Sequence, residues 1–444
     1  MPGSVAETRA DTGFAPLSRT ALIIVFGVSL AVAAGNSGLQ SVLPAIGRQI
    51  GIPDPLIAAI FSLSALLWTV SAPYWAKRSD RDGRRPMITL GLFGFAISMT
   101  GCACVVWAGL HKFIPPLLVF AGFALLRAVF GLIGSAANPA SQAYVAERTH
   151  AEGRTEALSQ LAGAFGLGTM AGPAIAPLFV IGILGLAGPM FFFAACAALV
   201  LIAVWKGVPE TRAKTPVAAA DDAVDLKPEG KSAGLWRDPA IRPFLFFGLL
   251  AGSAQQVNGY TLGFLVIDKL GETPMQAQKL IGVAMMAGAM AGLLAQWGLI
   301  RMFRMGPRHL LRWGAGLAAL GNLALALAPN YEMLVFAYAL INLGYGFCRP
   351  GFTAGASLAA SDKRQGEIAG AVTAVNGACV IVTPVLGVAL YKLFNPAPFL
   401  VNAAVLTALL AYVFYSVALK RAGAAPTNDA QNAASTYDYA EGGG

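Results

Sequence analysis

Charged residues are scarce in this sequence of 444 residues, of which 12% are Asp, Glu, Lys or Arg and 57% are hydrophobic. A soluble domain of this length needs more charge to cover its surface. The net charge of +9 does not indicate nucleic-acid binding, because the cations occupy loops between apolar runs and form no extended basic face. The composition therefore predicts a protein that lies in a membrane and binds no nucleic acid.

Cysteine and histidine are few and have no ligand-like spacing. The five cysteines lie inside apolar runs, where they behave as small hydrophobes, and the three histidines are scattered through loops. Neither a disulfide framework nor a metal site is indicated. The chain also lacks a phosphate loop, a His-Glu-x-x-His motif and a convergent Ser, His and Asp set. We therefore expect no metal, no cofactor and no enzymatic activity.

Apolar runs long enough to cross a bilayer make up most of the chain. A transmembrane helix needs about 20 such residues, and twelve runs meet this length. Their approximate limits are 20–46, 55–76, 86–109, 115–139, 157–182, 188–206, 242–267, 276–300, 309–328, 331–356, 368–391 and 397–419. The sequence therefore predicts an all-α membrane protein with twelve transmembrane helices.

A polar stretch divides these spans into two sets of six. Residues 207–241 contain prolines, paired aspartates and further charges, as linkers do. We expect an N-terminal tail at 1–19, a first half at 20–206, a second half at 242–419 and a disordered tail at 420–444.

The two halves are weakly repeated. A shift of 220 residues places Asn36 on Gln256 and Gln40 on Tyr260. It also aligns two predicted external loops, Ile50-Gly51-Ile52-Pro53 and Leu270-Gly271-Glu272-Thr273. Related halves joined by a linker are typical of parallel-repeat secondary transporters. We therefore expect two pseudo-symmetric six-helix halves around a central cavity.

Lysines and arginines are unevenly divided between the two sides of the predicted helices. Most of the 31 fall on the side of both termini, and the five on the other side are Arg48, Lys112, Lys269, Lys279 and Lys392. Cytoplasmic loops carry the excess of these residues. The pattern predicts a multi-pass protein of the bacterial inner membrane with both termini in the cytoplasm.

The densest cluster of charge lies between the spans 55–76 and 86–109. Gly83 permits a tight reversal of the backbone, and Asp80 can accept hydrogen bonds from a helix N-terminus or a guanidinium group. The cluster reads Ala76-Lys77-Arg78-Ser79-Asp80-Arg81-Asp82-Gly83-Arg84-Arg85. Two other patterns lie within spans and read Arg127-Ala128-Val129-Phe130-Gly131 and Gly168-Thr169-Met170-Ala171-Gly172-Pro173.

With these three motifs the sequence resembles the major facilitator superfamily, and within it the twelve-span drug:proton antiporters. The charged loop is similar to the family pattern Gly-x-Leu-Ala-Asp-Arg-x-Gly-Arg-Lys, from which it departs at Ala76 and Arg78. The motif at Arg127 is similar to the family's Arg-x-x-x-Gly, and the motif ending at Pro173 to the Gly-x-x-x-Gly-Pro signature of antiporters. The resemblance implies proton-coupled export of small amphipathic molecules, such as drugs or metabolites, by alternating access. An importer or facilitator of a small metabolite or vitamin in the same fold is the alternative.

The resemblance also implies roles for motif residues. It assigns a conformational latch to Asp80, Arg81, Gly83 and Arg84. We expect Asp80 to hold the outward-facing state closed by pairing across the cytoplasmic gap between the halves. Gly168 and Gly172 form a smooth helix face and Pro173 introduces a kink, so we expect a bending and sealing surface between the halves. Ordinary packing of small residues is the alternative.

Polar residues within the spans are the candidates for a substrate site. Arg127 lies near mid-membrane, where a cation is costly unless it faces water or a polar partner. It either lines the cavity, where it binds substrate or tunes a proton site, or ties the fourth helix to the first. Candidate cavity residues in the first and seventh spans are Asn36, Gln40, Gln256, Asn258 and Tyr260. Interhelical hydrogen bonding is the alternative for these five.

No Asp or Glu lies in the middle of a span, although proton-coupled carriers usually need a titratable carboxylate. Asp268 and Asp80, at opposite ends of spans, are the remaining candidates for proton coupling. A lone Arg127 in an otherwise neutral cavity favours a neutral or anionic substrate. We expect a small-molecule substrate, protons and membrane lipid as partners, and a functional monomer, because the fold needs no second chain to form its cavity.

Overall fold

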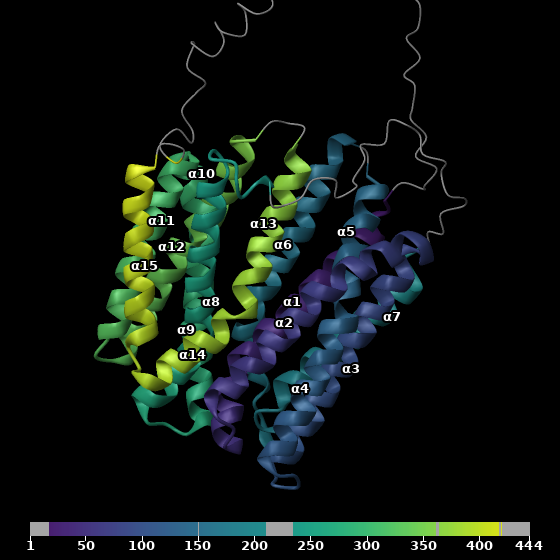
Figure 1. Cartoon of the computed structure of the whole chain (residues 1–444). Coiled ribbons are helices and arrows are strands. Elements are labelled where there is room, and N and C mark those ends of the chain that lie inside the picture. The colour runs from purple at the N-terminus through teal and green to yellow at the C-terminus, as the bar shows by residue number, and fades with distance from the viewer. Residues whose placement is uncertain (1–16, 150, 210–233, 361–363, 417–418, 420–444) are drawn as a thin grey trace, which may run out of the picture.

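The computed structural model describes residues 17–149, 151–209, 234–360, 364–416 and 419, and nearly all of these are helical (Figure 1). The helices before residue 208 are α1 (Arg19–Ile50), α2 (Asp54–Asp82), α3 (Arg84–Leu110), α4 (Pro116–Ile133), α5 (Ala137–Glu147), α6 (Ala151–Ile175) and α7 (Gly188–Gly207). A 3₁₀ turn joins α4 to α5, so that together they make one continuous span. We call these helices the N-terminal group.

The helices after residue 234 form the C-terminal group. They are α8 (Arg242–Leu270), α9 (Pro274–Leu293), α10 (Ile300–Phe303), α11 (Pro307–Leu327), α12 (Tyr331–Leu358), α13 (Gln365–Ile381), α14 (Thr383–Leu393) and α15 (Ala397–Tyr415). A π-helical turn joins α9 to α10. Figure 1 shows the two groups side by side, the N-terminal one in purple and blue and the C-terminal one in green and yellow.

Eleven helical segments among the described residues are long and apolar enough to cross a membrane. α8 is not among them although it has 29 residues, because Gln255, Gln256 and Asn258 lower its hydropathy. It packs against α12, α13, α14 and α15 and is therefore covered by other helices. The structure thus gives eleven apolar spans where the sequence predicts twelve.

Several predicted boundaries differ from those observed. The predicted span 157–182 ends early, at Ile175, where a 3₁₀ turn that contains Pro177 begins. The predicted span 368–391 is two helices, because Pro384 removes a backbone donor at the start of α14. Most of the predicted linker, 210–233, and the tail 420–444 lie outside the described residues.

Glycines end three helices where the sequence predicts tight loops. Gly51 and Gly271 cap α1 and α8 with φ of 90° and 63°, in the left-handed region. These glycines are 220 residues apart, so the predicted repeat has the same loop geometry in both groups. Gly83 reverses the chain between α2 and α3 at φ 100°. We name the two ends of the bundle after nearby residues, as the Arg48 end and the Asp80 end.

The helix groups contact each other through α1, α2 and α6 on one side and α8, α9, α13 and α14 on the other. Near the Arg48 end, Gly263 packs against the ring of Pro44, and Gly282 packs against the Pro177 ring and the carbonyl oxygen of Pro173. Missing Cβ atoms therefore let the groups approach closely at this end.

Replacing Gly83 by alanine should destabilise the protein. Its φ of 100° and ψ of 157° lie in a region that side chains rarely adopt, and such strain costs about 1–3 kcal/mol. Thermal unfolding in detergent measures the change. Gly27→Ala is the matched control, because Gly27 lies in α1 with nothing within 4 Å of an added Cβ. Equal unfolding midpoints for the two variants would contradict the strain at Gly83.

Candidate functional site

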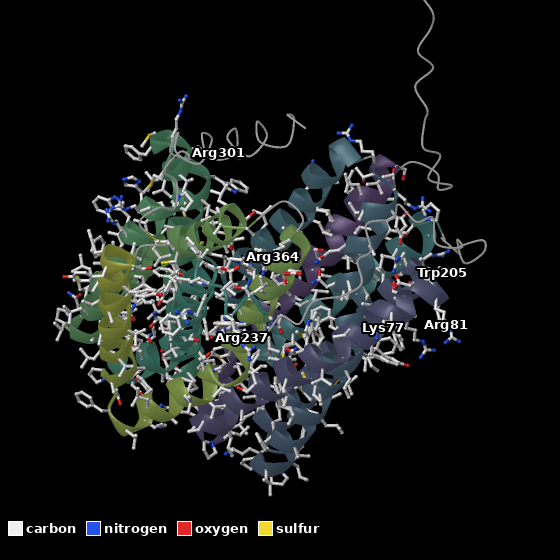
Figure 2. All side chains as sticks on the ribbon, turned by 45° about the horizontal axis from the view of Figure 1, so that its top comes forward. Lys77, Arg81, Trp205, Arg237, Arg301 and Arg364 are labelled. Carbon is white, nitrogen blue, oxygen red and sulfur yellow. The ribbon has the colours of Figure 1, made fainter. Side chains whose placement is uncertain are left out.

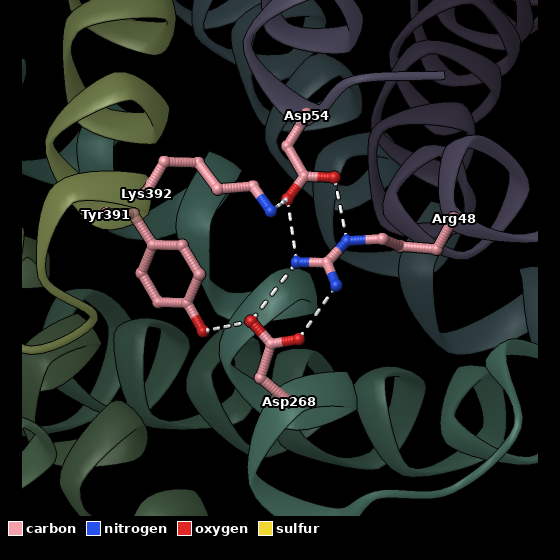
Figure 3. Close-up of polar contacts among 5 residues, drawn as sticks. All are labelled: Arg48, Asp54, Asp268, Tyr391 and Lys392. Atoms are coloured by element: carbon pink, nitrogen blue, oxygen red, sulfur yellow. Dashed lines mark hydrogen bonds and ion pairs between the residues drawn. The ribbon is translucent and has the colours of Figure 1, made fainter. Parts of the chain in front are cut away.

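A network of charged side chains joins the two groups at the Arg48 end (Figure 3). Its members are Arg48 of α1, Asp54 of α2, Asp268 of α8, and Tyr391 and Lys392 of α14. Arg48 binds Asp54 through its Nε and Nη2 atoms, both at 2.7 Å. The same guanidinium group reaches the two oxygens of Asp268 through Nη1 at 2.9 Å and Nη2 at 3.1 Å. One arginine therefore bridges two carboxylates from different groups.

A second ion pair joins the groups, and here the C-terminal group supplies the cation and the N-terminal group the carboxylate. The Lys392 Nζ atom of the C-terminal group lies 2.9 Å from Asp54 Oδ2. The Tyr391 hydroxyl donates to Asp268 Oδ2 at 2.8 Å. Two cations thus face two carboxylates, and each group supplies one of each. We call these five residues the Arg48 network.

Burial makes Asp54 the most constrained member of the Arg48 network. Its side chain is 2% exposed, whereas those of Arg48 and Asp268 are about a quarter exposed. A buried carboxylate that loses its cations is strongly destabilising. Asp54 therefore depends on Arg48 and Lys392 together, and this dependence favours contact between the groups.

Arg127 is buried in the N-terminal group and has an unusual set of partners. Its Nη2 atom donates to Asn36 Oδ1 at 2.7 Å, which ties α4 to α1. Its guanidinium carbon lies 5.3 Å from the Phe61 ring centroid and 4.4 Å from that of Phe130. Among the residues that the structure describes, its Nε and Nη1 atoms have no hydrogen-bond partner. The hydrogen bond to Asn36 is the link between the fourth and first helices that the sequence analysis gave as an alternative. The Nε and Nη1 donors of the guanidinium group take no part in it.

Asn258, a predicted cavity residue, is used for packing within the C-terminal group. It is 1% exposed and donates to the Tyr345 hydroxyl at 3.1 Å. Asn402 donates to its Oδ1 atom at 3.0 Å. Asn258 therefore links α8, α12 and α15, as the alternative of interhelical hydrogen bonding describes, and its role in lining a cavity stays a prediction. Its partners are distant in sequence, so no local pattern reveals them.

Asn36, Gln40 and Tyr260 lie where the two groups meet. The ring of Tyr260 in α8 packs edge-on against Phe61 in α2, with 5.2 Å between centroids. The Gln40 side chain lies beside Gly259 of α8, where an added Cβ would meet its amide nitrogen. Asn36 precedes Gln40 by one helical turn on the same face of α1. Gln256, also predicted for the cavity, is half-buried in α8.

The glycine face of α6 does not lie between the groups. A Cβ on Gly168 would meet Ala33 and the backbone of α1, and one on Gly172 would meet Ser37 and the Ala34 carbonyl oxygen. In this structure α1, within the N-terminal group, occupies the face of both glycines, as the alternative of ordinary packing describes, and the sealing surface between the halves stays a prediction. At the end of the motif, the carbonyl oxygen of Pro173 lies against Gly282 of α9 in the other group.

The charged loop at the Asp80 end makes its ionic contacts within the N-terminal group. Asp80 is 66% exposed and lies 2.6 Å from Arg84. Arg84 also binds Glu147 at the end of α5. Figure 2 shows Lys77 and Arg81 pointing away from the helices. The predicted pairing of Asp80 across the gap concerns a different conformation and stays a prediction.

A comparable contact lies in the C-terminal group. Arg364, which precedes α13, binds Asp238, which precedes α8, at 2.8 Å. The hydrogen bond from Arg364 is the largest cause that lowers the pKa of Asp238 below its usual value. Asp238 therefore stays ionised near neutral pH.

Sequence reasoning missed most of the Arg48 network. It gives Asp268 as a candidate for proton coupling. Arg48, Asp54 and Lys392 enter it only as charged residues at the ends of spans, without a role in binding. One signal was available, because Arg48 and Asp268 are 220 residues apart, the same shift that aligns the repeats. Opposite charges at equivalent positions can pair across the axis that relates two repeats.

Known proteins of similar sequence and fold are membrane transporters. The model of the Major Facilitator Superfamily matches residues 25–303 and 297–436. The class C tetracycline resistance protein of Escherichia coli is 25% identical over 393 residues, which cover 84% of this chain and 90% of the relative. Multidrug resistance protein 2 of Bacillus subtilis is 23% identical over 388 residues, covering 86% and 91%. A solved POT family transporter in complex with 5-aminolevulinic acid has a TM-score of 0.68 at 15% identity, covering 90% of this chain and 96% of that one.

Asp54→Asn should destabilise the protein by about 2–3 kcal/mol, somewhat below the range for a fully buried pair, because Arg48 and Lys392 are partly exposed. Thermal unfolding in detergent checks this value. Asp82→Asn is the control, since Asp82 pairs with the exposed Arg78 and should leave the midpoint unchanged. An Asp54→Asn midpoint no lower than that of the control would contradict the role of the buried carboxylate.

The contact between Asp238 and Arg364 should stabilise the protein equally at about pH 6 and about pH 8. A lowered carboxyl pKa gives stability that is present above the unfolded-state pKa and is lost as the pH falls through the folded-state pKa. The difference in unfolding midpoint between wild type and Asp238→Asn is therefore constant near neutrality. A difference that disappears between the two pH values would show that Asp238 titrates there.

Proposed function

The chain belongs to the Major Facilitator Superfamily, and we propose on this basis that it exports small amphipathic molecules across the bacterial inner membrane in exchange for protons. It is a multi-pass membrane transporter and not an enzyme. Curated relatives are tetracycline and multidrug resistance proteins, which supports efflux as the direction of transport. Tetracycline-like and other amphipathic drugs or metabolites are the substrate class that we propose.

We assign α8 as the twelfth span. The amide of Asn258 is bonded to α12 and α15, and the helix packs against other helices of its own group, so it can cross a bilayer despite its low hydropathy. The chain then has two six-helix halves, 20–206 and 242–419, related by the 220-residue shift. The excess of Lys and Arg at the Asp80 end places that end, and both termini, in the cytoplasm.

The observation that supports alternating access best is the Arg48 network. It joins the halves at the external end through pairs that cross in both directions, Arg48 to Asp268 and Lys392 to Asp54. These contacts can form only while the external end is closed. Opening to the outside breaks them, and the Asp80 loop then forms the cytoplasmic latch with Arg81, Gly83 and Arg84. Pro173, which lies inside α6 with its carbonyl oxygen against α9, is a candidate hinge for this motion.

We place proton coupling at Asp268. Protonation removes the charge that Arg48 binds and so weakens a contact between the halves. Asp80 is the second candidate, but among the residues that the structure describes it forms an ion pair with Arg84 of the same charged cluster alone. Asp268 is favoured because its ionisation is linked directly to a contact that the transport cycle must break.

The substrate site of this proposal lies between α1, α2, α4 and α8. Asn36, Gln40, Arg127, Gln256 and Tyr260 supply its polar groups. The protein acts as a monomer in contact with membrane lipid and needs no cofactor, because all of these residues come from one chain. A facilitator or importer of a small metabolite is the second candidate, and the lack of a carboxylate in the middle of the spans favours it.

Transport assays in liposomes test the proposal. Tetracycline should move uphill when an opposing proton gradient is imposed, and Asp268→Asn should reduce this uphill movement by about tenfold or more. Exchange of tetracycline without a gradient should continue in the variant. Glu272→Gln, an exposed acid outside the Arg48 network, is the control. Movement of tetracycline in the same direction as the protons would refute antiport, and indifference to the gradient would establish a facilitator.

A further inference from the structure

The guanidinium group of Arg127 is buried with part of its hydrogen-bonding capacity unused. The residue is 1% exposed, and Nη2 is its only nitrogen with a protein acceptor. The hydrogen on Nε and both hydrogens on Nη1 have none. No carboxylate among the described residues forms an ion pair with it. Arg127 is therefore a buried cation without a counter-ion.

Its surroundings stabilise the charge without satisfying these donors. The rings of Phe61 and Phe130 offer their faces to the cation, a favourable contact in a dry site. Neither ring accepts a conventional hydrogen bond in the plane of the guanidinium group. An uncompensated buried cation costs several kcal/mol, so the free edge favours a ligand that brings both negative charge and acceptor oxygens.

The site lies directly behind the contact between the two helix groups. Phe61 is covered by Tyr260, which belongs to the other group. Asn36, the partner of Arg127, shares a helix face with Gln40, which touches α8 at Gly259. Separation of α8 from α1 and α2 would remove this cover from Phe61 and open the surroundings of Arg127.

We propose that Arg127 anchors a binding site for the carboxylate of an aromatic or otherwise apolar substrate. The planar fork of arginine matches the two oxygens of a carboxylate. In Arg127 this fork consists of the Nη2 hydrogen that Asn36 does not take and a hydrogen of the neighbouring Nε or Nη1 atom. Phe61 and Tyr260 then provide apolar surface for the body of the molecule, which a small inorganic anion would not use. This inference deepens the proposed function and rests on it, because it assigns a charge and a chemical group to the exported molecule.

A pair of probes with the same ring system tests the site. 1-Naphthoate carries the carboxylate, and 1-naphthamide is its neutral counterpart. Purified full-length protein in detergent should bind naphthoate tighter than naphthamide by about tenfold, as measured by isothermal titration. Arg127→Gln should abolish this preference. Arg349→Gln, which removes an arginine from the span formed by α12, should keep it.

Asn36→Asp is a second variant that tests the same site while keeping the protein folded. It places a carboxylate 2.7 Å from Arg127 Nη2, where the amide oxygen lies now, and so supplies the missing counter-ion. The variant should unfold at a higher temperature than wild type and should lose the preference for naphthoate. Equal affinity of wild type for the two probes, no binding of naphthoate, or a preference that survives either Arg127→Gln or Asn36→Asp would overturn the inference.

These outcomes differ from failure of the proposed function. Binding is measured without a membrane or a gradient, whereas efflux is measured with tetracycline in liposomes. Efflux with no preference between the naphthalene probes overturns the carboxylate site alone. A preference for naphthoate that depends on Arg127, without efflux, supports the carboxylate site and overturns export.

Discussion

The ion pair between Arg48 and Asp268 is the contact on which the arrangement of the two helix groups depends. The two residues lie near the ends of α1 and α8 and are separated by the repeat distance of 220 residues. Lys392 and Asp54 repeat the pairing with the charges exchanged between the groups. The four charges neutralise one another, so the Arg48 network itself carries no net charge at the edge of an apolar bundle. Separation of the two groups removes Lys392 from the buried Asp54 and leaves it beside Arg48.

Scarcity of charge makes each of these contacts informative. In a chain whose spans contain almost no ionisable side chains, ion pairs occur where helices end. The Asp80 loop and the pair of Asp238 with Arg364 lie at one end, and the Arg48 network lies at the other. Arg127 departs from this pattern, because it is enclosed by aromatic rings with one amide as its partner. This contrast separates residues that hold the helices in place from the residue that we assign to the ligand.

The sequence was sufficient to predict what depends on local composition. Apolar runs predicted the helices, Gly83 predicted a tight reversal, and the repeat predicted the two loops that contain Gly51 and Gly271. Three short motifs indicated the family that the family model also matches. Partners distant in sequence could not be predicted in the same way. The glycine face of α6 could have met any helix, and Asn258 had polar neighbours on two helices of its own group. The break before α14 was missed although Pro384 signals it, because the apolar run continues across it.

The central claim is that Asp268 holds the external end closed through Arg48. The most direct test is the distance between spin labels at that end, attached after Gln49→Cys and Glu272→Cys in a protein without its native cysteines, and read by double electron–electron resonance. Both positions are exposed and lie just outside the ion pairs. We predict one short distance for the wild-type pair and a second, longer population when Asp268→Asn is added. The same single distance with and without Asp268→Asn would contradict the claim.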